Sequence, residues 1–156
     1  MSIEDDIAFL ERVPTLAVLG RDALRILAIG AENRYVHHGV TLFKSGEPAD
    51  AAYVVQEGSF DLAAEGTAST SVAGVGVMIG EHALVTETMR SMTVTAREPS
   101  TVIRIPRSLF LKTLEGYPEA ARRMRDAIAT RVNATARELA KVRAGLDGGG
   151  AAPARR

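Results

Sequence analysis

The chain has 156 residues, which is enough for one domain with a buried core and too few for two domains of ordinary size. Its 19 basic and 19 acidic residues give a formal net charge of zero, which excludes the broad positive field that non-specific binding to nucleic acid or anionic membranes requires. The absence of cysteine excludes disulfides, zinc–thiolate sites and thiol catalysis, and it is typical of a reducing compartment.

The amino-terminal sequence MSIEDDIAFLERV is acidic and amphipathic. It has neither the basic start nor the continuous apolar run of a secretory signal. No segment of the chain approaches the ~20 apolar residues that a membrane-spanning helix needs. We therefore expect a soluble cytoplasmic protein without a membrane span.

Apolar residues recur at helical spacing from residue 3 to residue 31, and Pro14 and Gly20 interrupt the pattern. The spacing predicts short N-terminal helices over 3–31. From residue 33 to residue 106 the pattern changes to short apolar runs separated by glycine-containing turns. Many short strands of this kind predict a small antiparallel β-roll, jelly-roll-like, over 33–106.

Helical periodicity returns after Pro106. The sequence RSLFLKTLEGYP predicts a short helix with Ser108 as its N-cap, and a longer helix opens at Pro118, a favourable first-turn residue. The C-terminal helices together occupy 107–146. The final GGGAAPARR, residues 147–156, predicts a flexible tail.

The predicted fold class is thus α+β: an antiparallel β-roll flanked by short N-terminal helices and by two C-terminal helices, in a single domain over 1–146.

The sequence IGEHALVTETMRSMTV, residues 79–94, combines groups that can bind a phosphodiester and a sugar hydroxyl. Gly80 allows the backbone to approach a ligand closely, and a helical turn after it would direct free N–H groups at an anion. Arg90, returning on the next strand, can place a planar guanidinium against phosphate oxygens, and Ser91 adds a hydroxyl donor. Glu81 offers a carboxylate acceptor to a sugar hydroxyl.

The same residues admit an interpretation without any ligand. Glu81 and Arg90 can form a surface salt bridge across a hairpin, worth roughly 0–1 kcal/mol and serving no function. The residue pattern alone leaves both interpretations open.

In its context this segment resembles the cyclic nucleotide-binding domain family, and the resemblance runs from Leu10 to about Arg143. The specific part is the phosphate-binding cassette of that family: a Gly-Glu pair, an aliphatic residue, Ala-Leu, a short variable step, and then an arginine before a small or hydroxyl residue. The matching residues here are Gly80, Glu81, Ala83, Leu84, Arg90 and Ser91.

The resemblance implies a role for each of these residues. Glu81 would accept from the ribose 2′-hydroxyl of the ligand, and Arg90 would hold its cyclic phosphate. Backbone N–H groups near Gly80 and Ala83 would also reach the phosphate, and Ser91 would lie near the phosphate or the base. The implied ligand is cAMP, with cGMP as the second choice.

Two residues depart from the family pattern. His82 stands where the family has an aliphatic residue, and Met92 stands where it has a small one, which leaves the pocket volume and the base preference open. His82 can touch the ligand, or it can be a packed or solvated imidazole. His37 and His38 are adjacent, so on a strand they point to opposite faces, and we expect no metal site.

The second C-terminal helix carries an apolar seam at steps of three and four. Its residues are Met124, Ile128, Val132, Thr135, Leu139, Val142 and Leu146. The seam can pack on the β-roll of its own chain, but its later positions favour a partner helix and hence a homodimer. Alignment with the catabolite activator proteins of the family places Thr135 at a base-contacting threonine, so we include it among the ligand-binding residues.

The sequence has no catalytic motif and no room for a DNA-binding helix-turn-helix after the long helix. We therefore expect no enzyme activity. The predicted function is a stand-alone cyclic nucleotide-binding regulatory module, which signals to a separate downstream protein by rearranging its C-terminal helix. The alternative is a family member that binds no nucleotide and serves for dimerisation or docking.

Overall fold

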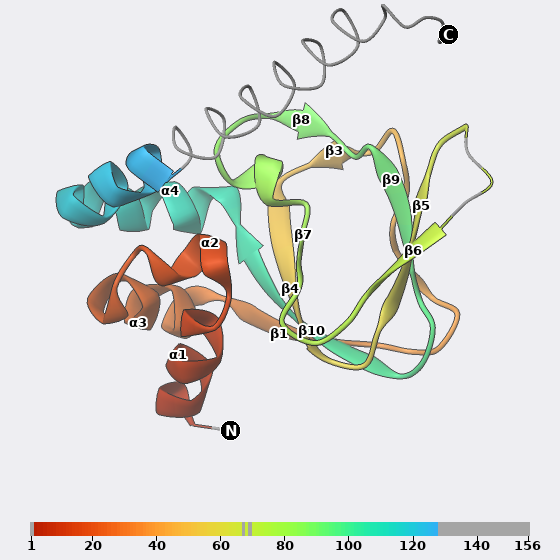
Figure 1. Cartoon of the computed structure of the whole chain (residues 1–156), viewed down its shortest axis with the longest axis horizontal. Helices are drawn as coiled ribbons and strands as arrows, with labels where there is room; N and C mark the ends of the chain where they lie inside the picture. Colours follow the sequence, from red (N-terminus) through yellow and green to blue (C-terminus); the bar gives the residue numbers. More distant parts are fainter. Residues whose placement is uncertain (1, 67, 69, 128–156) are drawn as a thin grey trace, which may run out of the picture.

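The structure is a computed structural model that describes residues 2–66, 68 and 70–127. The helices gather at one side of a roll made of antiparallel sheets (Figure 1). The α+β fold class predicted from the sequence, a β-roll with helices on either side of it in the chain, is confirmed.

Three short helices open the chain: α1 (Ile3–Glu11), α2 (Pro14–Ala17) and α3 (Arg21–Gly30). Pro14 is the first residue of α2, where its missing N–H costs no helical hydrogen bond. Gly20 precedes α3 with a φ of 87°, a conformation that favours glycine. The two breaks predicted from the sequence therefore separate the three helices.

The strands form two four-stranded sheets and one two-stranded sheet, all with antiparallel pairing. The first sheet has the order β1 (Glu32–Val36), β10 (Ser100–Pro106), β4 (Ala51–Glu57) and β7 (Met78–Ile79). The second has the order β2 (Thr41–Phe43), β9 (Met92–Ala96), β5 (Phe60–Ala64) and β6 (Thr70–Ala73). The third pairs β3 (Pro48–Ala49) with β8 (Thr88–Met89).

Strand β4 is buried on both faces because it separates two hydrophobic cores. Ala52 and Val54 belong to the core that the helices share with the first sheet. Tyr53 and Val55 belong to the core inside the roll. Alternate residues of one strand thus contact the helices and the interior of the roll, since successive side chains point to opposite faces.

Helix α4 (Arg107–Gly116) follows β10 directly. Its N-cap is Pro106, whose φ of −66° suits the start of a helix, and no side chain caps the helix. The predicted N-cap at Ser108 is wrong, because Ser108 lies inside the first turn. A further helix begins at Pro118, as predicted, and is described up to residue 127.

The seam residue Met124 is 3% exposed and packs into the core of its own chain. Ile128 and the predicted partner-facing positions of the seam, near Thr135 to Leu146, lie outside the described residues, as does the predicted tail at 147–156. Within the described ranges, no helix is both long and apolar enough to cross a membrane.

Candidate ligand-binding site

A single 3-10 turn, η1 (Glu81–Leu84), follows Gly80, where the sequence indicated that a helical turn could bind an anion. Gly80 itself has φ 75° and ψ 36°, the left-handed conformation that costs other residues about 1–2 kcal/mol. Its carbonyl accepts from the N–H of Ala83 at 3.1 Å. Ala83 and Leu84 are buried, and Leu84 belongs to the core that contains the helices. Packing against this core therefore holds the turn in place.

Arg90 lies in the link between β8 and β9 and not on a strand, which corrects the sequence-based expectation. The reason is that the backbone of Arg90 forms hydrogen bonds with the turn at residues 46–47 and not with a neighbouring strand. Its N–H donates to the carbonyl of Glu47 at 2.7 Å, and its carbonyl accepts from the N–H of Gly46 at 2.8 Å. These two bonds fix the point from which the side chain enters the roll.

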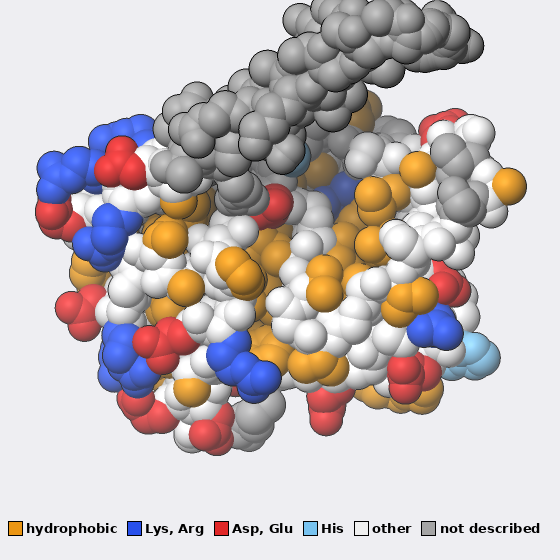
Figure 2. Space-filling view, in the orientation of Figure 1, with side chains coloured by type: hydrophobic (Ala, Val, Ile, Leu, Met, Phe, Trp, Pro, Cys, Tyr) orange, Lys and Arg blue, Asp and Glu red, His pale blue; other side chains and the backbone are white. Residues whose placement is uncertain are grey.

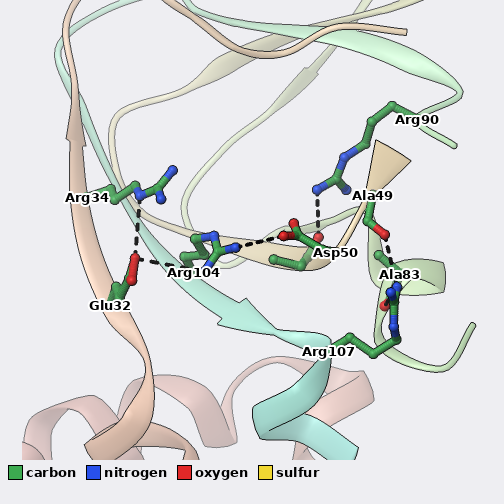
Figure 3. Close-up of polar contacts among 9 residues, drawn as sticks. Glu32, Arg34, Ala49, Asp50, Ala83, Arg90, Arg104 and Arg107 are labelled. Carbon is green, nitrogen blue, oxygen red and sulfur yellow. Dashed lines mark hydrogen bonds and ion pairs between the residues drawn. The ribbon is translucent and has the colours of Figure 1, made fainter. Parts of the chain in front are cut away.

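The guanidinium of Arg90 is buried, and the residue is only 7% exposed. Its Nη2 donates to the carbonyl of Ala51 at 2.9 Å (Figure 3). The group lies 4.0 Å from the ring centroid of Phe43 and 5.6 Å from that of Tyr53, so cation–π contacts support it. Burial lowers the pKa of Arg90, and the nearby Tyr53 and Asp50 oppose this shift.

The other terminal nitrogen of Arg90, Nη1, is buried without a hydrogen-bond partner. None of the ion pairs among the described residues joins Arg90 to a carboxylate, so the structure does not pair it with Glu81. A buried cationic donor without a partner is costly to the fold. An anion placed beside Nη1 would satisfy both its charge and its hydrogen-bonding capacity.

Arg90 lines a cavity of about 330 Å³, within the range of small-molecule sites. Figure 2 shows a recess over the roll, with hydrophobic side chains along it and basic atoms deeper inside. The cavity is lined by Phe43, Ala49, Ile79, Gly80, His82, Ala83, Thr88, Met89, Arg90, Ser91 and Met92. A mainly apolar wall with one buried cation suits a ligand that carries both an anionic group and a flat apolar surface.

Five of the seven residues predicted from the sequence meet at this cavity: Gly80, His82, Ala83, Arg90 and Ser91. Glu81 is not among the lining residues. Its carboxylate accepts a hydrogen bond at 2.8 Å from the hydroxyl of Thr15, on α2. Thr135 lies outside the described residues.

Apart from Met92 on β9, whose effect on the pocket volume the sequence had left open, the rest of the lining was not predicted, and it comes from four different strands. Phe43, Ala49 and Ile79 lie on β2, β3 and β7, and Thr88 and Met89 form β8. A weak signal was available for Phe43 and Ile79, since each ends a short apolar run. Their convergence on one cavity depends on how the sheets close, which no local pattern encodes.

Arg107 was also missed, although it ties the cassette to the rest of the fold. Its Nη1 donates to the carbonyls of Ala49 at 2.9 Å and Ala83 at 3.1 Å (Figure 3), and also to that of Thr86 at 3.2 Å. Because Arg107 is the first residue of α4, these bonds connect η1, β3 and the start of a C-terminal helix. The guanidinium of Arg107 therefore connects the cassette to α4.

The histidines show no metal-binding arrangement. Within the part of the chain that the structure describes, no three His, Cys, Asp or Glu side chains are grouped as metal ligands. His37 and His38 are exposed, and the ring of His37 contacts the edge of Tyr35 at a centroid distance of 4.6 Å.

Comparison with known proteins agrees with the geometry. The chain matches the family model described as the cyclic nucleotide-binding domain over residues 33–117. A solved structure of a cyclic nucleotide-binding-like protein from Brucella abortus has 37% sequence identity and a TM-score of 0.64, over 71% of this chain and 98% of that one.

Two relatives are considerably longer than this chain. An uncharacterised NTE family protein of Mycobacterium tuberculosis is 36% identical over 110 residues, which are 70% of this chain and 19% of the relative. The cAMP-dependent protein kinase regulatory subunit of Yarrowia lipolytica is 30% identical over 107 residues, 68% of this chain and 28% of the relative. The family match covers more than half of the chain and includes the cavity, so this chain belongs to the cyclic nucleotide-binding domain family.

Proposed function

We propose that this domain binds a cyclic mononucleotide, cAMP first and cGMP second, and acts as a cytoplasmic regulatory module without enzyme activity of its own. The observation that carries the proposal is the buried Nη1 of Arg90, which has no partner and stands beside Gly80 in the cavity. A cyclic phosphate is a compact monoanion that can accept from this donor. The kinase regulatory subunit among the relatives is named for cAMP, which supports this choice of ligand.

The residues divide into three roles around such a ligand. Arg90 and the backbone N–H groups near Gly80 and Ala83 bind the cyclic phosphate, and the N–H of Ala83 would exchange its bond to the carbonyl of Gly80 for one to the phosphate. Glu81 accepts from the ribose 2′-hydroxyl when its carboxylate turns toward the cavity. The base lies toward the mouth, where His82 and Ser91 are exposed and Thr135 of the C-terminal helix would reach it.

The effect of nucleotide binding is transmitted to the C-terminal helices by the contact between the cassette and α4. Arg107 bonds to the carbonyls of Ala83 and Thr86 and begins α4, so a ligand that orders the cassette also biases the packing of the C-terminal helices. This is a population shift, because the ligand favours the arrangement that it binds best. The changed helix surface is then read by a downstream partner, and the module forms a homodimer through its C-terminal helix.

One observation favours the alternative, in which the domain binds no nucleotide and serves for docking or dimerisation. The carboxylate of Glu81 is bonded to Thr15 and does not line the cavity. In a domain that has lost its ligand, such an internal bond would replace the one to ribose.

Calorimetric titration with cAMP, cGMP and cyclic dinucleotides separates the two functions. The proposed function predicts micromolar or tighter binding of one mononucleotide with a stoichiometry of about one. No heat with any of these ligands, from a protein with a normal cooperative unfolding transition, would favour the docking module.

A further inference from the structure

The hydrogen bond between Thr15 and Glu81 links the N-terminal helices to the cassette. Oγ1 of Thr15 donates to Oε2 of Glu81 at 2.8 Å in a partly buried position, across 66 residues of sequence. From this contact we infer that Thr15 is a specificity-determining residue, which competes with the ribose 2′-hydroxyl of a bound nucleotide for the carboxylate of Glu81. This role rests on the proposed binding of a cyclic nucleotide.

Thr15 cannot readily follow the carboxylate, because the residues that follow it in the chain are fixed by packing and by hydrogen bonds. The next residue, Leu16, is fully buried in the core that also contains Leu84 of the cassette. At the end of α2, Arg123 donates from Nε to the carbonyl of Val18 at 2.6 Å and from Nη2 to that of Leu19 at 2.7 Å. The position of the Thr15 hydroxyl is therefore set by the packing of α2.

The residues next to Glu81 show where its carboxylate has to go. Gly80, His82 and Ala83 line the cavity, whereas Glu81 does not. To accept from a ribose hydroxyl, its carboxylate has to turn from α2 toward the cavity and give up the bond to Thr15. Part of the binding energy of the 2′-hydroxyl is thereby offset by the lost internal hydrogen bond, since hydrogen bonds to a charged group are among the stronger ones.

Two consequences follow for ligand recognition. The domain discriminates between a ribonucleotide and its 2′-deoxy analogue less than Glu81 alone would allow. In addition, occupancy of the site and the bond that ties α2 to the cassette are coupled, and this coupling is reciprocal. Removing the Thr15 hydroxyl while keeping the shape of its side chain should therefore favour the ribonucleotide specifically.

The test is to titrate the full chain and its Thr15→Val variant with cAMP and with 2′-deoxy-cAMP. We expect Thr15→Val to bind cAMP about threefold to tenfold more tightly, as for the loss of one competing hydrogen bond. Its affinity for 2′-deoxy-cAMP should stay within about twofold of wild type, because that ligand does not recruit Glu81. Thr15→Ser keeps the hydroxyl and should behave like wild type.

Two controls separate this role from a general structural effect. Thr101→Val also removes a hydroxyl that donates to a glutamate, Oε1 of Glu57 at 3.3 Å, but in an exposed contact outside the cavity lining, and it should alter neither affinity. In a Glu81→Ala background, Thr15→Val should have no further effect on cAMP binding, as expected when both act through one interaction.

Three results would contradict the proposed competition between Thr15 and the ribose 2′-hydroxyl for Glu81. They are unchanged or weaker binding of cAMP by Thr15→Val, equal shifts for both ligands, and an undiminished effect of Thr15→Val in the Glu81→Ala background. A wild-type protein that binds neither ligand would instead refute the proposed function, and the role of Thr15 would fall with it.

Discussion

Gly80 leaves the space that the guanidinium of Arg90 occupies. A Cβ atom at position 80 would stand 2.6 Å from Nη1 of Arg90, closer than side-chain atoms tolerate. Gly80 also has a φ of 75°, a conformation that favours glycine, and any side chain at this position would make the end of the Arg90 side chain move. The glycine and the arginine of the cassette thus form one structural unit across ten residues of sequence.

The Gly80→Ala substitution should therefore lower stability and also disturb the site. The left-handed conformation alone costs an alanine about 1–2 kcal/mol, and Arg90 would have to move in addition. Gly39→Ala is a matched control, because Gly39 has a φ of 83° and a Cβ there would meet nothing within 4 Å. We expect both variants to unfold at lower denaturant concentration, but only Gly80→Ala to lose affinity for a cyclic nucleotide. Equal affinities in the two variants would show that the close approach to Arg90 is unimportant.

Arg107→Ala should weaken the connection between the cassette and α4. The substitution removes a charged donor from the carbonyls of Ala49, Ala83 and Thr86, and we expect it to destabilise the fold by about 1–3 kcal/mol in urea denaturation. Arg122→Ala is the control, since the exposed pair of Arg122 with Glu119 should contribute less than about 1 kcal/mol. If Arg107→Ala is as stable as this control, the three bonds do not hold the cassette.

Local sequence patterns predicted the features of the fold that depend on local chemistry. Pro14 and Gly20 marked the breaks between the first helices, and the helical turn that anion binding after Gly80 would need is present. Ser108 was wrongly predicted as a cap, because the preceding Pro106 already fixes a backbone dihedral suited to the helix start. The backbone dihedral of Pro106 therefore sets the start of α4, and no side chain caps this helix.

Contacts between distant segments were not predictable from the sequence. The bond from Thr15 to Glu81 joins residues that are 66 positions apart, and Phe43 meets Arg90 only because β2 and the β8–β9 link converge. The resemblance to a family identified Arg90, but burial and the unpartnered Nη1 could be seen only in the folded chain. The sequence therefore predicted the polar residues of the site but not most of the apolar residues that line the cavity.

The predicted homodimer depends on the seam near Leu139, which lies outside the described residues. Leu139→Glu places a charge in that seam, and burying it without a partner would be costly. We expect light scattering to report a dimer for the wild type and a shift toward monomer for Leu139→Glu. A wild type that is monomeric at high concentration, or a variant with an unchanged dimer, would refute dimerisation through this helix.

The central claim is that the Arg90 guanidinium binds the cyclic phosphate, and the most direct measurement is a calorimetric titration of wild type, Arg90→Ala and Arg90→Lys with cAMP. Losing a charge-assisted partner in a desolvated pocket costs about 2–5 kcal/mol, so Arg90→Ala should bind roughly thirtyfold or more weakly. Arg90→Lys should also lose much of the affinity, because an ammonium cannot reproduce the planar fork.

The exposed Arg97, which pairs with Asp61 at 3.4 Å, provides a control, and Arg97→Ala should bind cAMP like wild type. Melting curves of all variants establish that any weakened binding is not caused by unfolding. The account predicts a large loss of affinity confined to the Arg90 variants. If wild type binds cAMP and Arg90→Ala binds it equally well with a normal melting temperature, the assignment of the phosphate site to Arg90 is contradicted.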